Sequence, residues 1–201
     1  MSLASLLAVT LLAAAPGPAA PEGAPVPSVQ VNSAAPAKSQ GADDPMPSRL
    51  TSGHKAPDFQ YQSYDELWQN LHNFLEHGDV LLVFGASDVD LRTLERERES
   101  LVKGGVLPLA VVEKPDHEVW ASVRRLGLTF SLMADPRGAI GSLYGVYDPA
   151  VGHSTTSWFF IDKRCKVRSS GIGISSQGWL ALASNAFGRP FGPSTQTTSS
   201  H

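Results

Sequence analysis

Two continuous apolar runs dominate the middle of the chain. Residues 80–84 (Val-Leu-Leu-Val-Phe) and 106–112 (Val-Leu-Pro-Leu-Ala-Val-Val) contain almost only hydrophobic side chains. Uninterrupted runs of this length are typical of strands that are buried on both faces of a sheet. Pro108 lacks an N–H for the ladder, so it predicts an edge position or a bulge near the start of the second run.

Helical spacing of apolar residues predicts four helices between and around these runs. Residues that commonly end or cap a helix mark several of these patterns. Gly78 and Gly104 each follow a predicted helix, Ser87 or Asp88 can cap the second helix, and Ser176 can cap the last. The predicted helices cover residues 64–77 with Leu67, Trp68, Leu71, Phe74 and Leu75, residues 88–102 with Leu91, Leu94, Leu101 and Val102, residues 116–126 with Val119, Trp120, Val123 and Leu126, and a last helix with Trp179, Leu180, Leu182 and Ala183.

Shorter patterns complete the order of elements. Phe59 and Tyr61 predict a first strand, residues 130–133 another, and residues 139–144 a short helix, while residues 158–161 and 166–168 form a hairpin. Alternating strands and helices followed by a hairpin and a helix indicate an α/β three-layer sandwich, with a central mixed sheet and helices on both faces. This order is that of the thioredoxin fold. The right-handed crossover rule makes the first two long strands parallel.

The two ends of the chain have a different composition. An apolar run over residues 3–15 followed by small residues indicates a signal peptide over residues 1–20, although no Lys or Arg precedes the run and a disordered Ala-rich leader is the alternative. A Pro- and Ala-rich linker at 21–49, a folded domain at 50–187 and a disordered tail at 188–201 follow. We therefore expect an exported protein, periplasmic or extracellular.

Charge and length exclude several function classes. The formal net charge is −3, with 42% hydrophobic residues, and such a balance argues against nucleic-acid binding. The N-terminal apolar run is too short to span a bilayer, so no membrane-spanning segment is expected. No pattern calls for a cofactor. An unidentified protein is the expected partner, and the oligomeric state stays open.

Three segments, in the right order, resemble the peroxiredoxin family, also called the alkyl hydroperoxide reductase/thiol-specific antioxidant family. They span residues 53–170. The segments are Gly53-His54-Lys55-Ala56-Pro57-Asp58-Phe59, Leu132-Met133-Ala134-Asp135-Pro136-Arg137-Gly138 with Tyr144-Gly145-Val146, and Phe159-Phe160-Ile161-Asp162 with Lys166-Val167. The resemblance implies a thioredoxin-like fold and, in an intact member, thiol-dependent peroxide reduction.

The departures from the family fall at the positions that the resemblance assigns to chemistry. Aligned on Glu95, the peroxidatic cysteine falls at Arg92, or at Leu91 if the alignment slips by one residue, and its preceding Thr or Cys falls at Val89. The peroxide-polarising Arg falls at Thr156, and the cis-Pro of thioredoxin-like members at Ser157. Peroxide reduction needs a low-pKa thiolate and a nearby cation. Both are missing, and Asp88 and Asp90 would raise the pKa of a thiol placed at this helix start.

Cys165 is the only cysteine of the chain. The cations around it (Lys163, Arg164, Lys166 and Arg168) would favour a thiolate, which makes it a possible reactive thiol; the alternative is an ordinary residue of the hairpin turn. Core packing is the default interpretation of the four tryptophans. Trp158, next to the cis-Pro position, would be a binding anchor if it were exposed in the groove where relatives hold extended peptides.

Three hypotheses of function follow. The first is an exported, redox-inactive member of the family that acts as a binding or scaffolding module. The second is a weak thiol peroxidase that uses Cys165. The third is a metal carrier, although the six histidines show no ligand spacing and no metal site is expected from them.

Overall fold

A computed structural model describes residues 49–62, 67–173 and 178–191. The predicted signal peptide, nearly all of the linker, the Ser176 cap and residues 192–201 lie outside these ranges. The strands are β1 Gln60–Gln62, β2 Trp68–Asn70, β3 Asp79–Phe84, β4 Val106–Val112, β5 Ser131–Ala134, β6 Tyr147–Asp148, β7 His153–Ser154, β8 Ser157–Ile161 and β9 Val167–Ile172; the helices are α1 Leu71–His77, α2 Asp88–Lys103, α3 Asp116–Leu126, α4 Ala139–Leu143 and α5 Gly178–Phe187.

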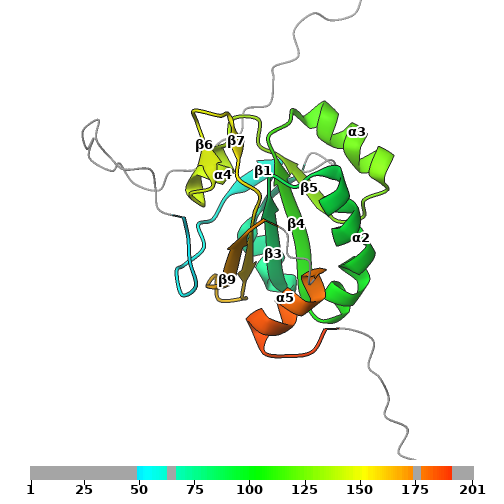
Figure 1. The fold of residues 1–201 in the computed structure, drawn as a ribbon, viewed down its shortest axis with the longest axis vertical. Helices are drawn as coiled ribbons and strands as arrows, with labels where there is room; N and C mark the ends of the chain where they lie inside the picture. The colour runs from blue at the N-terminus through cyan, green and yellow to red at the C-terminus, as the bar shows by residue number, and fades with distance from the viewer. Residues whose placement is uncertain (1–48, 63–66, 174–177, 192–201) are drawn as a thin grey trace, which may run out of the picture.

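The central sheet has five strands in the order β5-β4-β3-β8-β9 (Figure 1). Strand β3 pairs in parallel with β4, and β4 with β5, whereas β8 is antiparallel to both of its neighbours. The predicted mixed sheet and the parallel first crossover are confirmed. The two short hairpins, β1–β2 and β6–β7, form separate two-stranded sheets.

Alternate residues of each central strand enter two different cores. Leu82 and Phe84 face the core that contains the buried residues of α1 and α4, while Leu81 and Val83 face the core that contains those of α2, α3 and α5. Period-two alternation on strands that are buried on both faces explains the continuous apolar runs. The sandwich of three layers predicted from the sequence is therefore confirmed.

The helix predicted over residues 64–77 is wrong over residues 67–70, and its first three residues lie outside the described ranges. Trp68, Gln69 and Asn70 form β2, and α1 begins only at Leu71, because Asn70 caps it in a reciprocal capping box with Asn73. Leu67 and Trp68 are consequently exposed, by 58% and 50%, rather than part of a buried helix face.

Strand β4 lies inside the sheet, which corrects the edge position that Pro108 suggested. Its pairing with β5 begins only at Leu109, so no strand adjoins Pro108 on that side, while Leu81 of β3 lies opposite Pro108 on the other. The missing N–H is tolerated because one side of β4 is locally open.

The folded part extends beyond the predicted boundaries at both ends. Arg49 donates to the carbonyl of Gly171, and its guanidinium lies over the Phe159 ring. Phe191, assigned to the tail by the sequence, is buried in the α2–α5 core. Residues 188–191 therefore belong to the domain. None of the described helices is long and apolar enough to cross a membrane.

Candidate functional site

The junction between β3 and α2 is where the sequence places the missing active site. Gly85 follows Phe84 with φ at +58°, a left-handed value that glycine adopts readily. A Cβ at this residue would lie 2.7 Å from the carbonyl oxygen of Ser154 and 3.2 Å from the amide nitrogen of Thr156. The chain after β3 thus passes directly against the segment that leads into β8.

The N-terminus of α2 is closed by its own side chains. Ser87 is the N-cap, and its Oγ accepts the amide of Asp90 at 3.4 Å, while a carboxylate oxygen of Asp90 accepts the amide of Ser87 at 2.9 Å and its hydroxyl at 2.6 Å. This capping box occupies N–H groups that a helix start otherwise leaves open to an anion. The carboxylate of Asp90 already supplies the negative charge there.

A second carboxylate at the same helix start is held by α3. Asp88 accepts a hydrogen bond from Arg125 Nη1 at 2.6 Å. This hydrogen bond has the largest effect and lowers the pKa of the Asp88 carboxyl. Burial opposes it, and the charges of Arg125, Lys114 and Arg92 lower the pKa further. Nothing in the sequence pattern links Asp88 to Arg125, because the contact depends on how α3 packs beside α2.

The two positions that the resemblance assigns to the thiol motif are exposed. The side chain of Val89 is 67% exposed, and Arg92 is exposed as well. Arg92 is the fifth residue of α2, two residues after Asp90 of the capping box, so its amide lies within the helix ladder. Glu95, on which the alignment rests, accepts both the amide and the hydroxyl of Thr129, at 2.8 and 2.6 Å.

Thr156 and Ser157 do lie beside the junction, as the resemblance implies. Thr156 Oγ1 donates to the carbonyl of Gly85 at 2.9 Å, and Ser157 pairs with Phe84 across the β3–β8 ladder. The Ser157 hydroxyl is buried and has no hydrogen-bond partner. Thr156 therefore fastens the junction, and neither residue places a cation there.

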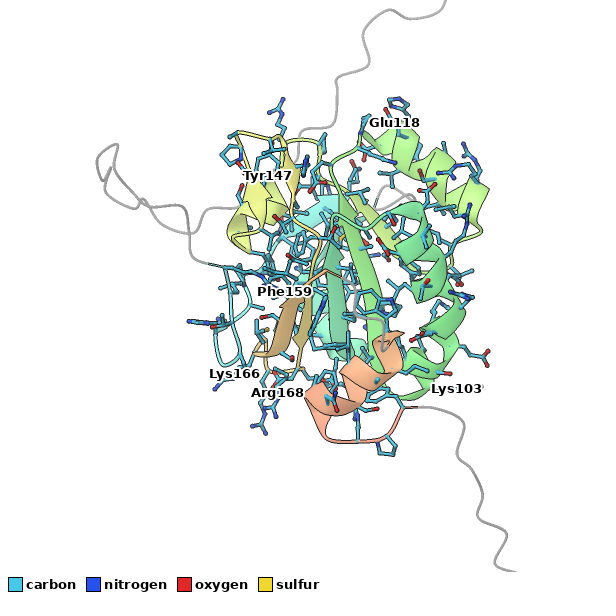
Figure 2. All side chains as sticks on the ribbon, viewed as in Figure 1. Lys103, Glu118, Tyr147, Phe159, Lys166 and Arg168 are labelled. Carbon is cyan, nitrogen blue, oxygen red and sulfur yellow. The ribbon has the colours of Figure 1, made fainter. Side chains whose placement is uncertain are left out.

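Cys165 lies at the opposite end of β3. The turn that contains Cys165 follows the end of β8, which pairs with the first residues of β3. Helix α2 follows the last residue of β3, so the length of that strand, roughly 17 Å, separates Cys165 from the start of α2. Figure 2 shows its neighbour Lys166 at the end of the molecule opposite to Glu118 of α3. Cys165 is too remote to replace a thiol at the junction.

The surroundings of Cys165 oppose formation of a thiolate. Burial raises the pKa of the thiol, and the charge of Lys55 only partly opposes this, whereas Asp58 and Asp162 raise the pKa further. Burial thus acts against the thiolate stabilisation that the sequence suggested for Lys163, Arg164, Lys166 and Arg168. Its Sγ lies 3.7 Å from His72 Nδ1, and its φ of +59° is a turn conformation.

Trp158 is not an exposed anchor. Only 8% of it is accessible, and its indole packs on the Phe160 ring and over Gly171 of β9, where a Cβ would lie 2.1 Å from the ring. Trp179 is also buried, but Trp120 is 41% exposed, so the core interpretation of the tryptophans is wrong for Trp68 and Trp120. Within the described ranges, no three His, Cys, Asp or Glu side chains come together as a metal site.

A hollow runs along the outer edge of β5, and we call it the β5 groove. It measures about 640 Å³ and is lined by α3, the C-terminal half of α2, β4 and the β1–β2 hairpin, with mostly apolar side chains. Trp120 and Val102 contribute its exposed apolar surface, and Arg98, Arg124 and Asp116 its charges. No sequence motif marked this surface.

One edge of the central sheet, strand β9, is covered by another segment of the chain, whereas the other edge, strand β5, is open among the described residues. The segment that begins at Arg49 covers β9: the amide of Gly53 donates to the carbonyl of Val167, and the amide of Val167 donates to the carbonyl of His54. Strand β5 has no strand on its outer side within the described part of the chain. An open edge beside an apolar groove can accept an added strand.

Comparison with known proteins relates this architecture to one family. Residues 52–170 match the AhpC/TSA family. The alkyl hydroperoxide reductase E proteins of Mycobacterium bovis and Mycobacterium tuberculosis are 28% identical over 129 residues, which cover 59% of this chain and 83% of theirs.

Solved structures with the same fold have lower identity. Peroxidoxin BcpB from Mycobacterium tuberculosis superimposes with a TM-score of 0.59 at 18% identity, covering 69% of this chain and 94% of its own. A thiol:disulfide interchange protein DsbE from Chlorobium tepidum gives 0.55 at 23% identity, covering 67% and 94%. These likenesses establish the thioredoxin-like fold.

Proposed function

The chain belongs to the AhpC/TSA family, and on that premise we propose that it is a redox-inactive member that acts as a binding module. The observation that carries this proposal is the start of α2. The helix terminus is closed by the Ser87–Asp90 capping box and by the Asp88–Arg125 pair, and the resemblance assigns the family's thiol position to Arg92. A thiolate would meet two carboxylates there instead of free N–H groups.

Thiol peroxidase activity through Cys165 is the competing function, and an assay separates the two. We expect peroxide consumption with a dithiol reductant to be the same for the wild-type protein and for Cys165→Ser, since the pKa of this thiol is raised by burial. The rate of reductant alone is the baseline. Cys165-dependent turnover of about 1 s⁻¹ or more would overturn the proposal.

A third variant in the same assay tests the junction itself. The double variant Cys165→Ser/Arg92→Cys places a thiol at the position that the resemblance assigns to the peroxidatic cysteine. It does not restore the peroxide-polarising arginine, whose assigned position holds Thr156. We expect it to stay at the baseline, because Asp88 and Asp90 disfavour a thiolate and no donor polarises the peroxide. Turnover by this variant would mean that only the sulfur had been lost, and that the rest of the site is intact.

The partner that we assign to the β5 groove is an extended segment of another protein. Its backbone would add to the open edge of β5, its apolar side chains would pack on Trp120 and Val102, and a carboxylate would meet the rim. Arg98 and Arg124 supply two positive charges against one negative charge from Asp116, and no salt bridge of the described residues involves either arginine. The rim therefore favours an acidic segment.

We place this function outside the cytosol, on the strength of the apolar run at residues 3–15. Fractionation of cells that express the full chain is expected to find it in the exported fraction, and a variant without residues 3–15 in the cytosol. Equal distribution of the two forms would refute export by this segment.

A further inference from the structure

A second hollow lies at the end of the sheet opposite to the junction, and its lining is almost entirely charged. It measures about 490 Å³ and is lined by His77, Asp79, Gly105, Asp162, Lys163, Arg164, Arg168 and Arg189. We call it the basic hollow. Arg168, seen in Figure 2 beside Lys166, comes from β9, Lys163 and Arg164 come from the β8–β9 turn, and Arg189 follows α5.

The positive charge of the basic hollow is only partly compensated. Four cations and two carboxylates line it, which leaves a net charge of +2 when His77 is neutral, in a chain whose net charge is −3. Arg189 pairs with Asp79 at 2.8 Å and Arg168 with Asp162 at 3.8 Å. Within the part of the chain that the structure describes, no carboxylate pairs with Lys163 or Arg164.

The same two carboxylates fix the turn that presents these cations. Asp79 accepts the amide of Lys163 at 3.1 Å, and Asp162 accepts the amides of Arg164 and Lys166, both at 2.9 Å. Because each carboxylate is committed to the backbone, its capacity to neutralise a further cation is reduced. The turn is thus held in place while Lys163 and Arg164 keep their charge available.

Arg189 is positioned from the other side of the hollow. Its guanidinium lies over the rings of Phe187 and Phe191, 5.3 and 5.2 Å from their centroids. Stacking on two rings restricts the side chain and leaves the edge of the guanidinium for hydrogen bonds. Cations that are fixed before binding lose less conformational entropy when a ligand arrives.

We propose that the basic hollow binds the phosphate groups of a ligand that carries at least two negative charges, such as a di- or triphosphate. Three arginines and a lysine around one concave surface match the oxygens of such a group, since the planar guanidinium donates two parallel hydrogen bonds to phosphate. The ligand charge would offset the uncompensated charge of Lys163 and Arg164. This inference is independent of the partner assigned to the β5 groove.

Calorimetric titration of the full chain with inorganic pyrophosphate tests the proposal. We expect saturable binding at low ionic strength that weakens as salt is added, and a roughly tenfold weaker affinity for Arg164→Ala, because a hydrogen bond to a charged group is lost. The matched control is Arg137→Ala, which removes an exposed arginine that follows β5 at the other end of the sheet. It is expected to bind like the wild type.

Two further arms identify the source of the phosphate. Equal affinities for pyrophosphate and ADP would mean that the hollow reads phosphate groups alone, and tighter binding of ADP would mean that it also contacts a nucleoside; both outcomes support the site. Absence of saturable binding by the wild type would overturn it. So would the same loss of affinity in Arg137→Ala as in Arg164→Ala, with circular dichroism showing both variants folded.

Discussion

Replacement of Tyr144 by alanine is expected to lower the free energy of unfolding by about 3–5 kcal/mol, the range for removing a large aromatic side chain from a core. Tyr144 is fully buried, and its ring contacts those of Phe59, Phe84 and Phe159, with centroids 5.2 to 6.3 Å apart. Since small domains are stable by only about 5–15 kcal/mol, this single change removes a large share of the total.

Tyr144→Phe is the matched variant, because it keeps the ring and removes only the hydroxyl. That hydroxyl donates to the carbonyl of Pro57 at 3.0 Å, so the expected loss is about 1–3 kcal/mol, from one hydrogen bond and one acceptor left unsatisfied. Urea unfolding, followed by the fluorescence of the buried tryptophans, measures both. Equal losses for the two variants would mean that the ring contacts contribute nothing beyond the hydroxyl.

The family segments that this chain retains are segments that build the core. Ala56 and Phe59 of the first are buried, Tyr144 of the second joins them, and Phe159 of the third lies in the same core. These residues have the same task whether or not the protein reduces peroxide. Their presence therefore supports the fold, and says little about activity.

Asp135 shows the same logic for a polar residue of the second segment. It is buried, and its carboxylate accepts the amides of Ala139 and Gly141 at 2.7 and 2.9 Å, so it fixes the start of α4. Burial raises its pKa, which those amides only partly oppose. An acid in this motif is required by the short helix, independently of thiol chemistry.

The sequence could predict the sheet because its strands are buried on both faces, which leaves long apolar runs that have no other common explanation. The prediction missed β2, because Leu67 and Trp68 continue the helical spacing of α1. The true start of α1 was nevertheless readable in the sequence from the Asn70-x-x-Asn73 capping pattern.

Two features of single residues had no readable signal in the sequence. Trp158 fits the default core interpretation, and its burial depends on Gly171 of the paired strand, which leaves space for its ring. The cations around Cys165 are adjacent in sequence, yet three of them line the basic hollow, and burial raises the pKa of the thiol. Both outcomes depend on where side chains point from the β8–β9 hairpin, which only tertiary packing decides.

If the partner binds in the β5 groove, alanine substitutions of two partly exposed tryptophans are expected to have very different effects on the affinity for the partner. Trp120 lines the groove, whereas Trp68, exposed to a similar extent, is not part of its lining. We expect Trp120→Ala to weaken the binding of an extended peptide more than tenfold, because tryptophans at the centre of an interface carry a large share of its energy. Trp68→Ala, which removes as much aromatic surface, is expected to leave the affinity unchanged.

The probe for this comparison is a peptide selected from a displayed library of random twelve-residue sequences on the full wild-type chain. The expected consensus is a segment of alternating apolar residues that includes an acidic residue. The open edge of β5 would pair with its extended backbone, and Arg98 and Arg124 would attract its carboxylate. Reversing both arginines to glutamate is then expected to weaken binding about tenfold, an effect typical of two rim charges.

Charge reversal also separates specific binding in the groove from a long-range effect of the net charge of the chain, which is −3. Arg137→Glu changes the charge of the chain by the same amount per residue, but Arg137 is absent from the groove lining. If Arg137→Glu weakened the binding of the peptide as much as the reversal of a groove arginine did, binding would be a long-range effect of net charge. If Trp120→Ala and Trp68→Ala behaved alike, the β5 groove would not be the binding surface, and the proposed binding module would have to recognise its partner elsewhere.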